Sequence, residues 1–224
     1  MPDGGRVGSL AGLLPGGPGH SHQCVRDISS LAGVPRLVLI EPSCERETAM
    51  AVEYCLHQTP ESCYLRLVSI TVQVPYDLPA GYRLQEGGGV VLREGRDAVA
   101  IGYGPIMLAQ AWKAAEILEA EHGIGLRVIN LPWLNRLDRG WLRDAIGGRA
   151  ALFTLDNHYL TGGQGQMILA ALAELGLASR MTVRRFGVER IPESGQNEEV
   201  LRAHGLDAAS LAKAVVGELS RAPV

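Results

Sequence analysis

Short apolar runs alternate with amphipathic runs along most of this chain. Apolar runs that fit buried strands cover residues 36–40, 62–67, 90–92, 98–101, 125–131, 150–155 and 181–186. Runs with helical spacing cover residues 23–31, 45–57, 106–121, 142–146, 167–175, 197–204 and 208–219. Continuous apolar strands are typical of parallel sheets, because helices cover both faces of such sheets. The alternation therefore predicts an α/β fold with a mostly parallel sheet.

The pattern is interrupted between residues 71 and 89, where Pro75, Pro79 and three consecutive glycines break any regular spacing. We predict a linker over residues 71–87 that joins two parts of the chain, residues 1–70 and 88–224. The stretch up to Gly19 is rich in glycine, and Ser43 is a plausible N-cap for the helix that follows it.

Composition and charge exclude several classes of protein. Hydrophobic residues make up 46% of the 224 residues, which is enough for a packed core. The net charge of -3 gives no electrostatic reason to bind nucleic acid or an anionic membrane. The apolar runs are too short to span a bilayer, and the first residues lack the pattern of a signal peptide. We expect a soluble, cytoplasmic protein.

The four cysteines all precede residue 64, at positions 24, 44, 55 and 63. None forms a Cys-x-x-Cys pair, and no regular histidine spacing accompanies them. Free buried thiols are the simpler interpretation, and we predict no metal site on this chain.

A polar segment with three glycines, residues 156–166, follows one apolar strand and precedes a helix. Open α/β sheets bind ligands at this end of their strands. Gly163 and Gly165 suggest a dinucleotide loop, but Ile168 occupies the position of the third glycine. A structural turn, in which the glycines let the helix pack close to the strand, is the preferred interpretation. An anion at the helix N-terminus stays an alternative.

Two histidines, His20 and His22, lie in a glycine-rich loop just before a helical run. Histidine exchanges protons near neutral pH, so the pair could contact a polar substrate. A metal site would need a third ligand at a familiar spacing, and an ordinary surface loop is the remaining alternative. Arg66 ends an apolar strand, where it either reaches solvent or meets a phosphate or carboxylate in a cleft.

Several segments, in the same order, resemble the C-terminal half of the transketolase family of thiamine-diphosphate enzymes. Gly19-His20-Ser21-His22-Gln23 resembles the family's Gly-Pro-Thr-His-(His/Gln) stretch, and Tyr64-Leu65-Arg66-Leu67 resembles its Tyr-Ile-Arg-Leu strand. The spacing in residues 156–165 resembles its Glu-(Asp/Gly)-His-x-x-x-Gly-Gly-x-Gly turn. Residues 41–48 and 187–207 also resemble family segments.

The resemblance implies a partial pyrimidine-binding α/β domain followed by a three-layer α/β C-terminal domain with a mostly parallel sheet. Residues 1–70 would be the tail of the first, and residues 88–224 a complete transketolase C-terminal domain. By the same resemblance, His22 faces the substrate and is the catalytic candidate. His20 and Arg66 join it as substrate-binding candidates, with Arg66 at the substrate's phosphate.

Departures from the family matter as much. The glutamate that activates the cofactor, and the diphosphate and metal site, would all lie upstream or on another subunit. We therefore predict no cofactor-binding residue on this chain. His20 stands where the family commonly has proline, and Arg26 where glutamate is frequent. No further histidine lies near Leu10, so the sugar substrate stays open.

These features predict a subunit or fragment of a split, thiamine-diphosphate-dependent transketolase-type transferase. It would move a two-carbon ketol unit from a ketose donor to an acceptor, and it would not be active alone. Its partner would be an N-terminal transketolase-like subunit that binds most of the thiamine diphosphate and Mg²⁺, in a dimer or heterotetramer. The alternatives are a non-catalytic assembly or regulatory module, and the beta subunit of a pyruvate-dehydrogenase-like complex.

Overall fold

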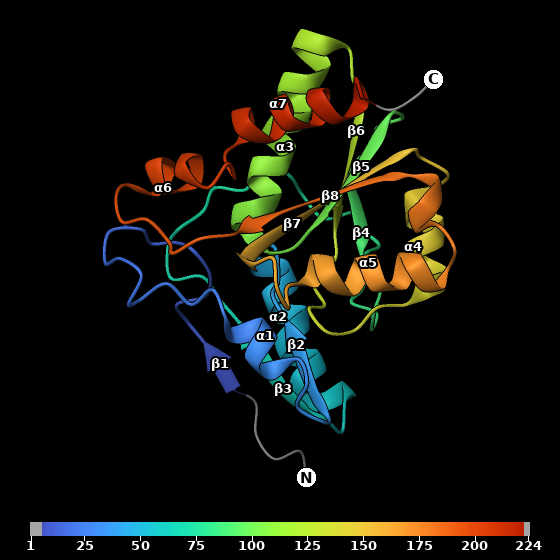
Figure 1. The fold of residues 1–224 in the computed structure, drawn as a ribbon. Helices are drawn as coiled ribbons and strands as arrows, with labels where there is room; N and C mark the ends of the chain where they lie inside the picture. The colour runs from blue at the N-terminus through green and yellow to red at the C-terminus, as the bar shows by residue number, and fades with distance from the viewer. Residues whose placement is uncertain (1–5, 222–224) are drawn as a thin grey trace.

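The computed structural model describes residues 6–221 and contains two sheets (Figure 1). In the first sheet, all strands are parallel, in the order β1 (Arg6–Gly8), β3 (Ser62–Arg66), β2 (Leu37–Ile40). The second sheet has the order β4 (Val90–Arg93), β6 (Leu126–Asn130), β5 (Ala98–Gly102), β7 (Ala151–Tyr159), β8 (Thr182–Val188). Only β4 in this sheet runs antiparallel to its neighbour. The predicted α/β fold with mostly parallel sheets is confirmed.

Seven α-helices accompany these strands in the described part of the chain. They are α1 (Asp27–Leu31), α2 (Glu45–Glu53), α3 (Gly104–His122), α4 (Arg139–Ile146), α5 (Gln164–Glu174), α6 (Asn197–Ala203) and α7 (Ala208–Leu219). A π-helical turn, Tyr54–Gln58, continues α2, and a 3₁₀ turn, Ala178–Arg180, precedes β8.

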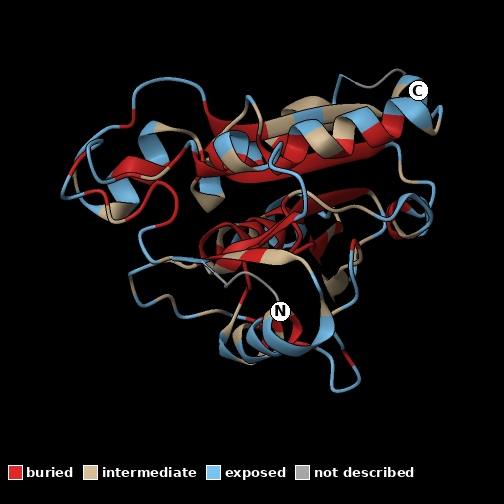
Figure 2. Cartoon of the chain, turned by 90° about the horizontal axis from the view of Figure 1, so that it is seen from below, coloured by how far each residue is buried: buried red, intermediate tan, exposed pale blue. Residues whose placement is uncertain are grey.

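The second sheet is the middle of three layers (Figure 1). Helices α3 and α7 cover one face, where Leu108 and Leu211 belong to the same hydrophobic cluster as Ala100. Helices α4 and α5 cover the other face, where Leu142 and Leu172 belong to the same cluster as Ile101. Ala100 and Ile101 are neighbours on β5, and successive strand residues point to opposite faces. Figure 2 shows the buried residues concentrated in the strands and on the inner sides of the helices.

The first sheet shares its core with the second. Val38, Ile40 and Leu65 belong to the same hydrophobic cluster as Ile101 and Leu142. The outer edge of β2 is covered by the chain after β6, because Leu134 N–H donates to the Leu39 carbonyl. The Asn135 side chain continues this pairing, since it accepts from Leu39 N–H and donates to the Leu37 carbonyl. The two sheets are therefore joined by both apolar contact and backbone pairing.

Some local details differ from the sequence-based expectation. The N-cap of α2 is Cys44 rather than Ser43, whose N–H instead donates to Glu47 Oε2 at 2.7 Å. Strand β1 was not predicted, because glycine obscures its short apolar signal. The segment of residues 67–89, all described, contains no helix or strand. Buried and exposed residues nevertheless alternate in part of it, since Tyr76 and Leu78 are buried and Asp77 between them is exposed.

The boundaries predicted for the two domains stay predictions.

No described helix has both the length and the hydropathy that crossing a membrane requires. All four cysteines are free; Cys63 is buried, and the other three are half-buried.

Candidate functional site

Arg66 lies completely buried where the two sheets meet. Its guanidinium forms ion pairs with Asp27 (Nε–Oδ2 2.7 Å) and with Glu41. Its Nη2 group donates to the main-chain carbonyls of Cys24 at 3.1 Å and Asn157 at 2.9 Å. Each nitrogen of the guanidinium thus has a partner inside the protein. The substrate-binding role that the resemblance implies for Arg66 stays a prediction, since a ligand would have to displace one of these partners.

The charged groups of this centre respond differently to burial. Burial alone would raise the pKa of Asp27, but Arg66 and the Tyr64 hydroxyl, which donates at 3.0 Å, hold it below its usual range. Burial raises the pKa of Glu41 even though Arg66 opposes it. Glu41 Oε1 has no hydrogen-bond partner among residues 6–221. Burial would lower the pKa of Arg66, yet the two carboxylates raise it well above its usual range. Arg66 therefore stays charged, and Asp27 supplies the matching charge.

A close backbone contact fixes the position of Glu41. Gly104 is the first residue of α3 and has φ +68°. A Cβ atom at this position would overlap Glu41 Oε1. Glycine is therefore required here both by the left-handed backbone and by the space that the carboxylate occupies.

The polar residues at the start of the 156–166 segment lie inside the protein, because β7 continues to Tyr159. Asp156 accepts from the backbone N–H groups of Gln164 (2.8 Å) and Gly165 (2.9 Å), at the start of α5. The Tyr103 hydroxyl donates to Asp156 at 3.2 Å. Burial raises the pKa of Asp156 to about 6 although these donors oppose it. Asp156 thus occupies the helix N-terminus that an external phosphate would need.

His158 connects the two halves of the chain. Its Nδ1 lies 2.7 Å from the Tyr159 carbonyl oxygen, which can only accept, so Nδ1 carries the proton. Its Nε2 accepts from the backbone N–H of Ser29 on α1 at 3.3 Å. Burial lowers the pKa of His158, which agrees with a neutral ring that both donates and accepts.

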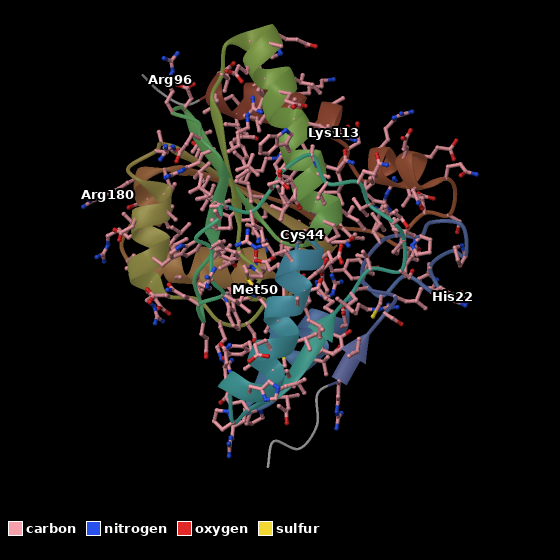
Figure 3. The ribbon with its side chains drawn as sticks, turned by 180° about the vertical axis from the view of Figure 1, so that it is seen from behind. His22, Cys44, Met50, Arg96, Lys113 and Arg180 are labelled. Carbon is pink, nitrogen blue, oxygen red and sulfur yellow. The ribbon has the colours of Figure 1, made fainter. Side chains whose placement is uncertain are left out.

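His20 and His22 are both exposed on the loop before α1, and Figure 3 shows His22 at the outer edge of the molecule. Ser21 Oγ lies 3.0 Å from His22 Nδ1. The base of the loop is anchored by buried Gln23, whose Nε2 donates to the carbonyls of Leu13 (2.9 Å) and Glu193 (3.1 Å). The loop surrounds a hollow of about 260 Å³. It therefore presents two imidazoles to a ligand from a fixed base.

The structure brings the loop and the buried centre close together, since Arg66 binds the carbonyl of Cys24, two residues after His22. It does not gather ligands for a metal. Among residues 6–221, no group of three or more His, Cys, Asp or Glu side chains could hold a metal ion. A magnesium–diphosphate group needs several oxygen ligands. The described residues do not fit this group by themselves, and we derive no chemical step through it.

Comparison with known proteins gives a consistent result. A family model described as the transketolase C-terminal domain matches residues 87–211. A protein named as a transketolase C-terminal section in Methanocaldococcus jannaschii is 26% identical over 216 residues, which cover 96% of this chain and 66% of that protein. Human transketolase is 30% identical over 217 residues, which cover 96% of this chain and 34% of the human protein.

Among solved structures, a split-gene transketolase, described as an inactive beta4 tetramer, superposes with a TM-score of 0.82. It is 28% identical, and the match covers 96% of this chain and 67% of that one. The family-model match and the superposition thus assign this α/β fold to the C-terminal region of a group of transferases. The chain belongs to the transketolase family, as the resemblance predicted. It spans about a third of the length of human transketolase.

Sequence reasoning identified Arg66 but missed its partners. Glu41 begins a segment that resembles the family, and Asp27 directly follows Arg26, but the sequence suggested no role for either. Asp27 is 39 residues from Arg66 in sequence and Glu41 is 25 residues away. Spacing at such distances gives no signal of an ion pair.

Proposed function

We propose that this chain is one subunit of a split, thiamine-diphosphate-dependent transketolase-type transferase. In the assembled enzyme it helps to move a two-carbon ketol unit from a ketose donor to an acceptor. A partner subunit with an N-terminal transketolase-like region binds the diphosphate and Mg²⁺. The assembly is a dimer or heterotetramer, the isolated chain is inactive, and a cytoplasmic location is part of the same proposal.

One observation carries this proposal: almost the whole chain superposes on a transketolase chain that is itself the product of a split gene. The sequence match to a separate C-terminal section in Methanocaldococcus jannaschii supports it independently. The absence of a metal-binding cluster among residues 6–221 is compatible with a partner that supplies this site.

Within the proposed enzyme, His22 assists proton handling or holds substrate hydroxyls, and His20 contributes to substrate binding beside it. Support comes from their exposure on an anchored loop. We keep Arg66 as a substrate-binding candidate for the assembled enzyme, in which an anionic donor would replace one of its internal partners. Its geometry in the described chain gives it a second role, which is to hold Asp27 and Glu41 between the sheets.

Reconstitution tests the proposal. The chain is mixed with a subunit that carries the diphosphate site, and ketol transfer is assayed with thiamine diphosphate, Mg²⁺ and a panel of ketose donors. Activity is expected only in the mixture. His22→Ala should lower kcat by about 100-fold or more, the usual contribution of a proton-transferring group. His57→Ala, an exposed histidine on the π-helical turn, serves as the control and should leave kcat unchanged.

Three outcomes decide against this function. Turnover by the isolated chain would contradict the split-enzyme interpretation. A complex that assembles and works equally well with His22→Ala would instead support the non-catalytic assembly module. Transfer to a lipoyl carrier rather than to a sugar would identify the pyruvate-dehydrogenase-like alternative.

A further inference from the structure

A second polar hollow lies where the carboxyl ends of β7 and β8 meet α1. It encloses about 520 Å³, and we call it the junction hollow. Its polar lining consists of Arg26 and Ser29 from the α1 region, Tyr159 at the end of β7, Thr161 from the glycine turn, and Arg185 and Glu189 from β8 and the chain just after it. The carboxyl ends of parallel strands are where open α/β sheets bind their ligands.

The walls of the junction hollow are fixed by hydrogen bonds between segments far apart in sequence. Tyr159 N–H donates to the Val25 carbonyl at 3.0 Å, and Leu160 N–H donates to the Val188 carbonyl at 3.1 Å. The glycine turn also packs tightly on α1, because a Cβ atom on Gly162 would overlap Ser29. The hollow is therefore formed before any ligand binds, which lowers the entropic cost of binding.

Two arginines, Arg26 and Arg185, line this space without carboxylate partners among the described residues. Among residues 6–221, neither Arg26 nor Arg185 forms an ion pair. Arg185 is oriented by a hydrogen bond from Nη1 to the Leu160 carbonyl at 3.0 Å, and the Arg26 side chain is exposed. Thr161 adds an exposed hydroxyl, and Glu189 is the one acidic residue in the lining.

Neighbouring sites lack this free charge. The guanidinium of Arg66 is occupied by Asp27 and Glu41. Arg184, next to Arg185 on β8, points to the opposite face of the strand and is paired with Glu218 at 2.8 Å. The junction hollow is thus a place where two arginines are available to an anion, although the whole chain has a net charge of -3.

We propose that the junction hollow is an anion-binding site that takes a phosphate group, held by Arg26 and Arg185. Guanidinium groups bind phosphate oxygens through paired, charge-assisted hydrogen bonds, which suits a hollow lined by two arginines. Arg26 also lines the hollow beside His20 and His22, so a phosphate here places the rest of its molecule near the histidine loop. Assigning the phosphate to a substrate rests on the proposed function, whereas the site itself does not.

The site is tested on the full chain alone, by titration with inorganic phosphate at constant ionic strength. Backbone amide shifts of Ser29, Thr161 and Arg185 are followed by NMR. These shifts should saturate in the unaltered chain. Arg26→Gln and Arg185→Gln should each weaken phosphate binding about tenfold, which is the loss expected for one charge-assisted contact. The matched control is Arg184→Gln, which makes the same charge change at the adjacent position and should alter the affinity by less than about twofold.

The site is overturned if the unaltered chain shows no saturable shifts, or if Arg184→Gln weakens binding as much as Arg185→Gln. Arg185→Lys guards against misfolding, since it keeps the charge and should bind phosphate more tightly than Arg185→Gln. Titration with ribose 5-phosphate, and with ribose as the uncharged control, shows whether the site takes a phosphate monoester or free phosphate. Tighter binding of the sugar phosphate than of free phosphate assigns the site to a phosphate monoester, and equal affinity assigns it to free phosphate. Equal binding of ribose overturns the proposal.

Failure of this site and failure of the proposed function are distinguishable. Phosphate binding by the chain, together with an inactive reconstituted complex, overturns only the function. An active complex whose chain binds no phosphate overturns only the site.

Discussion

The ionic centre around Arg66 and the histidine loop of residues 20–22 are neighbours in space with opposite physical characters. Arg66 is fully buried, and every nitrogen of its guanidinium has an internal partner. His20 and His22 are exposed, and only the base of their loop is anchored, through Gln23. The residue type alone therefore does not identify a ligand-binding site, because the same side chain can make all its hydrogen bonds inside the folded protein.

The ionic centre and the histidine loop have different roles, one in holding the fold together and the other in meeting a ligand. The ionic centre joins segments far apart in the chain, since Arg66 connects β3 with the Cys24 and Asn157 carbonyls. The histidine loop adds little to that joint and is free to meet a ligand. Mutations in the centre should therefore change stability, and mutations in the loop should change activity.

Removal of the positive charge of Arg66 should have the largest effect on stability. Arg66→Met should lower the free energy of unfolding by about 3–5 kcal/mol, because Asp27 and Glu41 are left buried without their cation. Urea denaturation measures this loss. Adding Asp27→Asn and Glu41→Gln to the same chain should restore part of it, since no uncompensated charge remains. A loss below about 1 kcal/mol would mean that the pairs are not structural.

The pH dependence of stability should also come from the buried residues. The pKa of Asp156 is raised from 3.8 to about 6, so the folded chain holds a proton that the unfolded chain releases. Its contribution to stability is therefore present below about pH 4, is lost as the pH rises to about 6, and changes little above that. The full change is on the order of 3 kcal/mol.

Asp156→Asn isolates this effect, because it removes the titrating group. The free energy of unfolding of the variant minus that of the unaltered chain should rise between pH 4 and pH 7. Chemical denaturation at several pH values measures this difference. A flat difference, or a fall, would show that Asp156 does not titrate as proposed, and His22→Ala should leave the profile unchanged.

The close contact between Gly104 and the Glu41 carboxylate should have a smaller effect on stability. Gly104→Ala meets both a left-handed backbone and the Glu41 carboxylate, whereas Gly123→Ala meets only the backbone strain. Gly123→Ala should cost about 1–2 kcal/mol, and Gly104→Ala at least about 1 kcal/mol more. Thermal or urea unfolding of the two variants separates the cost of backbone strain from the cost of the contact with Glu41. Equal losses would mean that the carboxylate can move aside without cost.

The histidine loop should give the smallest effect on stability. His20→Ala and His22→Ala should each change the free energy of unfolding by less than about 0.5 kcal/mol, as for exposed residues in general. Gln23→Ala should cost about 1–2 kcal/mol, because it removes one buried and one partly buried hydrogen bond at the base of the loop. The same unfolding measurement covers all three. A large loss for His22→Ala would place this residue in the fold rather than at a site.

The order of helices and strands could be predicted because each element has its own local pattern. Strand β5 and helix α3 are continuous apolar and amphipathic runs, and both lie within a few residues of their predicted limits. Strand β1 escaped prediction because three residues next to glycine carry too little signal. The alternating segment after Leu67 was not predicted, because prolines interrupt its pattern and it forms no strand.

The site was predictable only in part. His22 and Arg66 could be identified from the resemblance, but their different exposure could not, because burial depends on which distant segments meet. The Arg66 contact with the Asn157 carbonyl spans 91 residues, and the hollow between Arg26 and Arg185 joins segments even further apart. Such contacts result from the assembled fold and leave no mark in local spacing.

Calorimetry with thiamine diphosphate and Mg²⁺ tests the split-subunit proposal most directly, on three samples: the chain alone, a subunit with the diphosphate site alone, and their mixture. If the cofactor site lies on the partner, the chain alone should show no saturable binding, and binding to the mixture should be tighter than binding to the other subunit. Saturable binding of the cofactor to the isolated chain would contradict this proposal.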